Sequence, residues 1–218
     1  MVIAVDGPGG VGKSTVASRV AVALALPHLD TGSTYRAAGL MALQSGAPLD
    51  DSDAVLAALD EVDIRINDGI VSIDDVDVTE ALRSDEVTKA SSVVATHRDV
   101  RERIVALQRA WVAKRGGSAV VEGRDIGTVV FPDTPVKIYL TARPEIRAAR
   151  RSGDAEAADK SKDQIAAELA ARDHTDSNRK ASPLRPADDA EIIDTSDLSI
   201  DEVVEQVLAL VKATADER

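Results

Sequence analysis

The chain has 218 residues, of which 44% are hydrophobic, enough to bury one sizeable α/β core with an inserted subdomain. It carries 26 basic and 38 acidic residues, and the net charge of −12 argues against a nucleic-acid coat or a membrane-surface protein, since both need a basic face. The absence of cysteine excludes disulfides and thiolate metal sites, and it suits a reducing compartment.

No segment reaches the roughly 18 uninterrupted apolar residues that a membrane span needs. Residues 1–6 lead directly into a strand-like run without the pattern of a signal peptide. We therefore expect a cytoplasmic protein. No apolar stripe demands a partner chain, so we expect a monomer that binds neither nucleic acid nor membrane.

Apolar runs of strand length recur along the chain. The first, residues 2–5, ends in a glycine-rich turn, and residues 13–25 follow as a predicted helix, rich in Ala and Val without Gly or Pro. Further strands are predicted at residues 27–29, 119–122, 136–140 and 190–194. Apolar runs without alternation fit parallel strands covered on both faces, which predicts a doubly wound α/β sheet with ligands at the carboxyl ends of its strands.

Two regions interrupt this pattern. Residues 62–66 and 70–73 alternate with period two around a turn that contains Asp-Gly, which predicts a hairpin within an inserted subdomain. Residues 152–162 form a small, polar, charged linker that could act as a mobile flap. The helix after it is predicted to begin at Ser161, which is spaced as a capping box with Gln164, and the last helix begins with a similar pair, Ser199 and Glu202.

A glycine-rich motif follows the first strand directly. Residues 7–14 match G-x-x-x-x-G-K-[ST] and open the predicted helix, which is the context this phosphate-binding loop requires. Backbone N–H groups of such a loop surround a triphosphate, while Lys13 would bridge the β- and γ-phosphates and Ser14 would hold Mg²⁺. The predicted ATP-binding residues are Gly7, Pro8, Gly9, Gly10, Val11, Gly12, Lys13, Ser14 and Thr15.

This motif identifies the phosphoryl donor but leaves the acceptor open, because GTPase switches, sugar kinases, shikimate-type kinases and nucleotide kinases all carry it. A GTPase switch should also contain the guanine motif N-K-x-D, which the sequence lacks. A sugar or shikimate kinase needs a carboxylate that takes a hydroxyl proton.

Arginines gather at positions that folding could bring to one cleft. Planar guanidinium groups bind phosphate oxygens in pairs and offset the repulsion between two anions, so they favour an acceptor that is already phosphorylated. For any single arginine the alternative is a surface residue or a partner for a neighbouring acid. The arginines are Arg36, Arg101, Arg124, Arg143, Arg147, Arg150, Arg151, Arg172 and Arg179.

Several motifs together resemble those of bacterial cytidylate kinases over nearly the whole chain. They are Asp6-Gly-Pro-Gly-Gly-Val-Gly-Lys-Ser-Thr15, Asp30-Thr-Gly-Ser-Thr-Tyr-Arg36, Glu122-Gly-Arg-Asp-Ile-Gly-Thr-Val-Val-Phe-Pro-Asp133, Arg172-Asp-x-x-Asp176-x-x-Arg179 and Ser182-Pro-Leu184. The resemblance implies a P-loop fold of three layers with a five-stranded parallel sheet, a subdomain that binds the nucleoside monophosphate, and a small lid. The implied reaction is transfer of phosphate from ATP to CMP or dCMP in pyrimidine metabolism.

The resemblance also implies residue roles. Arg36, Arg124 and Arg179, with Arg172, would bind the CMP phosphate; Ser92, Arg101 and Asp125 would read the cytosine edge, Asp176 would bind the sugar hydroxyls, and Thr31 would support the acceptor through its hydroxyl. Lys13, Arg124, Arg147, Arg151 and Arg179 would be the catalytic residues. The implied boundaries are 1–33, 96–151 and 163–218 for the core, 34–95 for the subdomain and 152–162 for the lid.

Three positions leave alternatives open. Glu122 stands where many enzymes with this loop carry an Asp, so it would either contact Mg²⁺ through water or cap its strand. The lid residue that reaches ATP could be Arg147, Arg150, Arg151, Lys160 or Lys162. Trp111, the single tryptophan, is interpreted as a packing residue in preference to a base-stacking one.

Overall fold

The computed structural model describes residues 1–67, 69–153 and 160–216, and the chain divides into two compact units. The first unit consists of Met1–His28 and Val112–Arg218, and the second is Leu29–Trp111. The second unit contains the predicted insert at 34–95 and extends beyond it at both ends. Asp68 in the predicted turn and residues 154–159 in the predicted lid lie outside the described residues.

The structure contains a five-stranded parallel sheet, as the sequence predicts; four of its strands belong to the first unit, and β2 begins with the residue at which that unit passes into the second. Its strands, in the spatial order β2-β6-β1-β7-β8, are β2 (His28–Asp30), β6 (Ala119–Gly123), β1 (Val2–Asp6), β7 (Val136–Thr141) and β8 (Glu191–Asp194). β1 pairs in parallel with both β6 and β7, and every residue of β1 is buried, because the faces of this central strand are also covered. This central position explains the uninterrupted apolar run that predicts the strand.

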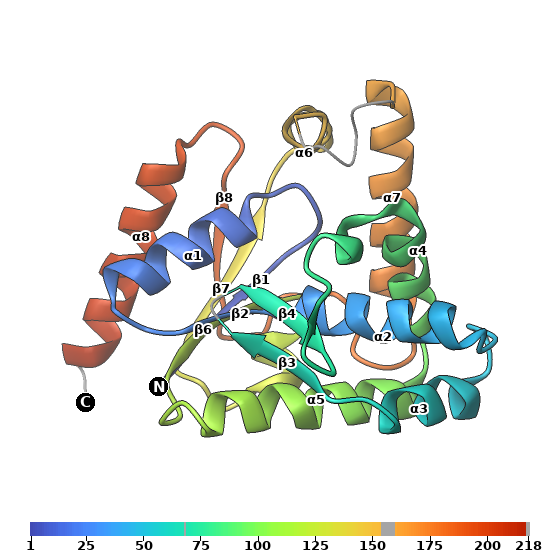
Figure 1. Ribbon diagram of the computed structural model, residues 1–218. Coiled ribbons are helices and arrows are strands. Elements are labelled where there is room, and N and C mark those ends of the chain that lie inside the picture. Colours follow the sequence, from blue (N-terminus) through green and yellow to red (C-terminus); the bar gives the residue numbers. More distant parts are fainter. Residues whose placement is uncertain (68, 154–159, 217–218) are drawn as a thin grey trace. The chain divides into compact units, whose positions relative to one another are not determined.

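One face of this sheet is covered by α1 (Lys13–Ala23) and α8 (Ile200–Asp216), which lie side by side in Figure 1. Val16 and Val20 of α1 pack with Val203 and Val207 of α8 and with the strands in one apolar core. Fully burying each such side chain stabilises the fold by about 1.5–3 kcal/mol. The first helix ends two residues before the predicted position, and Ala25 adopts a positive φ of 51° beyond it.

Three further elements complete the first unit: η2 (Ile126–Val130), a π-helical turn after β6, α6 (Pro144–Arg151) and α7 (Lys162–Asn178). The capping box at Ser161 and Gln164 is confirmed, with both reciprocal hydrogen bonds present. The Ser199–Glu202 box before α8 is confirmed as well. Both boxes satisfy backbone N–H groups that a helix start leaves without partners.

The second unit contains four helices and a small sheet among its described residues. They are α2 (Thr31–Ser45), α3 (Ser52–Asp60), β3 (Ile64–Asn67), β4 (Ile70–Ile73), β5 (Val76–Asp77), the 3-10 turn η1 (Ala81–Arg83), α4 (Asp85–Val94) and α5 (Arg98–Ala113). The predicted antiparallel hairpin is confirmed, with Ile64 opposite Ile73. β5 was not predicted, since two residues carry no periodicity.

Helices α2 and α4 approach closely at Gly39. A Cβ at that position would lie 2.8 Å from the backbone nitrogen of Ser91, so a larger residue would push the helices apart. Within the part of the chain that the structure describes, no helix combines the length and hydropathy needed to cross a membrane.

Candidate active site

The glycine-rich loop connects β1 to α1 in the first unit. Gly7, Gly10 and Gly12 have φ angles of 144°, 79° and 92°, which L side chains rarely adopt. A Cβ on Gly7 would lie 2.2 Å from the carbonyl oxygen of Leu140, so only glycine allows the chain to leave the strand here. Gly12 is the N-cap of α1, whose N-terminus favours an anion.

Lys13, the first residue of α1, is buried against this loop. Its Nζ donates a hydrogen bond to the carbonyl oxygen of Pro8 at 2.7 Å. The ammonium group is therefore held at the loop, where the predicted contact with phosphates requires it.

Ser14, Glu122 and His28 form a chain of polar contacts beside the loop. The Oγ of Ser14 donates to Oε2 of Glu122 at 2.9 Å, and Oε1 of Glu122 lies 3.0 Å from Nε2 of His28. Hydroxyl and carboxylate oxygens are ligands that Mg²⁺ prefers, so this pair fits a divalent ion held directly or through water. No local pattern predicts the contact with His28, because the partners are separated by 94 positions.

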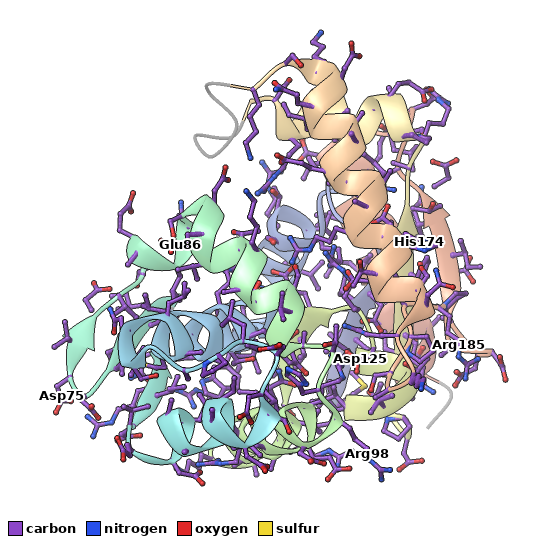
Figure 2. All side chains as sticks on the ribbon, turned by 90° about the vertical axis from the view of Figure 1, so that its right-hand side faces the viewer. Asp75, Glu86, Arg98, Asp125, His174 and Arg185 are labelled. Carbon is purple, nitrogen blue, oxygen red and sulfur yellow. The ribbon has the colours of Figure 1, made fainter. Side chains whose placement is uncertain are left out.

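Helix α6 reaches the loop through two arginines. Nε of Arg147 donates to the carbonyl oxygen of Gly9 at 2.7 Å, and Nη1 of Arg150 donates to that of Val11 at 3.4 Å. Arg147 also pairs with Asp173 on α7, in the same turn as His174, which Figure 2 labels. Arg147 is thus fixed to the backbone of the loop, whereas Arg150 makes its shorter hydrogen bonds to Oγ1 and the carbonyl oxygen of Thr195, at 2.8 and 2.6 Å.

The other lid candidates are placed on the same two helices or just before α7. Arg151 ends α6 and is partly buried. Lys160 pairs with Glu168 at 2.9 Å, and Lys162 is exposed at the start of α7.

Arg124, Asp176 and Arg179 form a connected cluster. Nε of Arg124 donates to Oδ2 of Asp176 at 3.0 Å, and Nη1 of Arg179 donates to Oδ1 of the same carboxylate at 3.5 Å. Arg172 lies one helical turn before Asp176 on α7. A Cβ on Gly9 would lie 3.9 Å from Nη2 of Arg124, so this guanidinium group is close to the phosphate-binding loop.

Asp6, the last residue of β1, anchors the segment that follows Arg124 and Asp125. Its Oδ1 accepts the N–H of Ile126 at 2.9 Å, and its Oδ2 accepts the N–H of Gly127 at 2.8 Å. Burial raises the pKa of Asp6 to about 6, although these two hydrogen bonds act in the opposite direction. Asp125, two residues after β6, is also buried and is labelled in Figure 2.

The second unit holds four of the predicted acceptor residues. Nη2 of Arg36 donates to Oδ2 of Asp30 at 2.6 Å, and Oδ1 of Asp30 caps the start of α2 by accepting the N–H of Gly32. The guanidinium carbon of Arg101 lies 5.1 Å from the ring centroid of Tyr35, a cation–π distance.

Thr31 and Ser92 are the other two. Thr31 is buried in the first turn of α2, where its carbonyl oxygen accepts a hydrogen bond from Oγ1 of Thr34 at 2.6 Å. Oγ of Ser92 donates to the carbonyl oxygen of Thr88 at 3.2 Å on α4.

The structure therefore groups the predicted site residues by unit. In the first unit these are Lys13, Ser14, Glu122, Arg124, Asp125, Arg147, Arg151, Arg172, Asp176 and Arg179, and in the second Thr31, Arg36, Ser92 and Arg101. Several residues beside this set had no predicted role. His28 and Asp173 contact Glu122 and Arg147, Asp30 contacts Arg36, and Asp6 holds the segment that follows Asp125. For Asp6 a signal existed, because a carboxylate ends an otherwise apolar strand immediately before the loop.

Comparison with known proteins identifies related sequences along the whole chain. The family model of cytidylate kinases matches residues 3–213. A cytidylate kinase of Corynebacterium glutamicum is 46% identical over 99% of this chain and 96% of its own length. One from Pelotomaculum thermopropionicum is 47% identical over 97% and 96%. Among solved structures, a gluconokinase from Sinorhizobium meliloti has a TM-score of 0.52 at 15% identity, covering 99% of this chain and 94% of its own, which is a likeness of fold alone.

Proposed function

Because the chain belongs to the cytidylate kinase family, we propose that it transfers a phosphoryl group from ATP to CMP or dCMP, forming CDP or dCDP. The observation that carries this proposal is the Arg124–Asp176–Arg179 cluster next to the glycine-rich loop. Arg124 lies close to the triphosphate cradle and shares a carboxylate partner with Arg179, and such a pair of guanidinium groups suits an acceptor that is itself a phosphate. The fold shared with a gluconokinase gives no support to a sugar acceptor, since one fold serves many acceptors.

The donor half of the site is proposed to be the loop at residues 7–15. Its backbone N–H groups and Lys13 bind the phosphates of ATP, and Arg147 stabilises the loop through the carbonyl oxygen of Gly9. Ser14 and Glu122 would hold Mg²⁺, which when bound would offset negative charge on the phosphates. Arg147 and Arg151 are proposed to act on the transferred group from α6.

The acceptor half is proposed to consist of the residues that the family motifs imply. Arg36, Arg124, Arg172 and Arg179 bind the CMP phosphate. Asp176 binds the sugar hydroxyls. Cytosine is read by Asp125, Ser92 and Arg101, with Thr31 in support; a carboxylate accepts from the amino group of the base, and a guanidinium donates to its ring acceptors.

The chemistry proposed is direct in-line transfer without a general base. The CMP phosphate is ionised at neutral pH, so its oxygen attacks without losing a proton. The protein then contributes alignment of the two phosphates and compensation of their charge, tasks that arginines perform well. We further propose that the protein works in the cytoplasm as a monomer.

A coupled assay of ADP release tests this function across CMP, dCMP, UMP, AMP, GMP and shikimate. We expect CMP or dCMP to give the highest kcat/KM, and release to depend on Mg²⁺. If CMP is no better than UMP or AMP, the cytosine assignment is wrong. If shikimate is preferred, the phosphate acceptor itself is wrong.

A further inference from the structure

Asp6 connects two parts of the proposed site in the first unit, the phosphate-binding loop and the segment that carries Arg124 and Asp125. It directly precedes Gly7, where the phosphate-binding loop begins, and its carboxylate accepts the N–H groups of Ile126 and Gly127. These two residues directly follow Arg124 and Asp125. One side chain thus joins the start of the donor loop to the end of the segment that carries the acceptor residues.

The contact is specific in its geometry. The two carboxylate oxygens each take one N–H, at 2.9 and 2.8 Å, so the group cannot rotate without losing a bond. The register of β1 and β6 places Asp6 beside Gly123, which fixes the same segment from its other end. A Cβ on Gly127 would lie 3.2 Å from side-chain carbons of Lys137 and 3.5 Å from Oδ2 of Asp6, so the turn is closely packed here.

Keeping a carboxylate at this position is costly to the fold. Asp6 is only 5% exposed, and burial disfavours its ionised form. Asp125 adds repulsion, while Lys13 of α1 offers attraction, and Tyr139 faces the group from β7. A buried carboxylate in an otherwise apolar strand destabilises the fold, and such unfavourable residues are expected at functional positions.

We propose that Asp6 is a positioning residue that sets Arg124 and Asp125 relative to the phosphate-binding loop. This rests on the proposed function and deepens it. Asp6 touches neither nucleotide; it aligns the acceptor phosphate with the phosphoryl group of the donor. Loss of this alignment lowers the transfer rate more than it lowers the affinity for either nucleotide, because each binding half stays intact.

The test compares Asp6→Asn with wild type. Asparagine keeps the size and one acceptor oxygen, but its amide N–H₂ opposes one of the backbone N–H groups. We expect kcat for CMP phosphorylation to fall about 10- to 100-fold, with the Kd values of CMP and ATP, measured by calorimetry, changing less than about threefold. Slow ATP hydrolysis without acceptor needs only the donor half, so it should stay near the wild-type rate.

Thr134→Val is the matched control. Thr134 donates a buried hydrogen bond to the carbonyl oxygen of Val2 at the opposite end of β1, so its loss destabilises the same strand away from the site. It should lower Tm and leave kcat near wild type. If Asp6→Asn fails to fold, Gly127→Ala displaces the same turn from its other side and should lower kcat selectively as well.

Two results overturn the proposal: kcat for these variants within about twofold of wild type, or transfer and acceptor-free hydrolysis that fall together in proportion. Neither result touches the proposed function, which depends on the wild-type protein alone. A wild-type protein that phosphorylates no nucleotide would instead refute the function.

Discussion

Replacing Asp176 with alanine should destabilise the protein without nucleotide and make it unusually responsive to phosphate. The carboxylate joins Arg124 and Arg179, whose side chains are 18% and 5% exposed, so its removal leaves two largely buried guanidinium groups without their shared anion. Removing one partner of a buried pair costs 3–5 kcal/mol, and since Arg124 keeps some contact with water we expect about 3 kcal/mol. For a chain of this length that corresponds to a fall in Tm of about 6–12 °C.

Phosphate should reverse much of this loss. An anion bound between the two arginines replaces the missing carboxylate, so inorganic phosphate should raise the Tm of Asp176→Ala more than that of wild type. Differential scanning fluorimetry across a phosphate titration measures both effects. Turnover of CMP by Asp176→Ala, measured without added phosphate, should be lower than that of wild type, because the variant also lacks the proposed contact with the sugar.

Asp197→Ala is the control for this experiment. Asp197 receives two hydrogen bonds from Arg143, each at 2.7 Å, but both side chains are exposed, so the Tm and its response to phosphate should stay close to wild type. A shared role of Asp176 in holding the two arginines is refuted if Asp176→Ala melts within about 2 °C of wild type, or if phosphate shifts the Tm of both proteins equally.

Three other predictions follow from single contacts. The pKa of Asp6 is about 6 in the folded protein against an ordinary value of 3.8, so protonation of Asp6 stabilises the folded state. This stabilisation is fully present below the ordinary pKa of 3.8 and is lost as the pH rises through 6. The free energy of unfolding of wild type relative to Asp6→Asn should therefore fall by about 2 kcal/mol between pH 4 and 7 in urea titrations, and a flat difference would contradict the shift. Gly39→Ala should lower the free energy of unfolding by about 1–3 kcal/mol despite its better helix propensity, because its Cβ meets the backbone of Ser91; an increase would show that α2 and α4 separate freely. Lys13→Met should lower kcat by at least about 100-fold while CMP binding in calorimetry stays close to wild type, and a smaller loss would remove Lys13 from the transfer step.

The central strands could be predicted because each lies between neighbours in a covered sheet, and burial on both faces leaves an apolar run in the sequence. The helix starts at Ser161 and Ser199 could also be predicted from the sequence, since a capping box is complete within four positions. Local chemistry thus determined both types of element. β5, with two exposed residues, lacks any such pattern.

Contacts between distant segments were beyond prediction. Asp6 and Gly127 are separated by 121 positions, and Arg147 and Gly9 by 138, so only the completed sheet and helix packing bring them together. The residue types of the site could be predicted, because a phosphate site needs glycines that let the backbone surround the anion and lysine and arginine side chains that offset its charge. Which oxygen each guanidinium binds is decided by tertiary structure, as the sharing of Asp176 by Arg124 and Arg179 illustrates.

The burial of Trp111 gives this protein a natural optical reporter. The indole N–H donates to the carbonyl oxygen of Ile66 on β3 at 2.7 Å, and the side chain lies inside the second unit. As the sequence contains one tryptophan, one phenylalanine and two tyrosines, emission excited at the red edge of the protein absorption band comes from this indole alone. Fluorescence therefore follows the unfolding of the second unit, whereas far-UV circular dichroism follows both. Denaturation curves that coincide would identify one cooperative transition, and curves that separate would measure how independently the two units unfold.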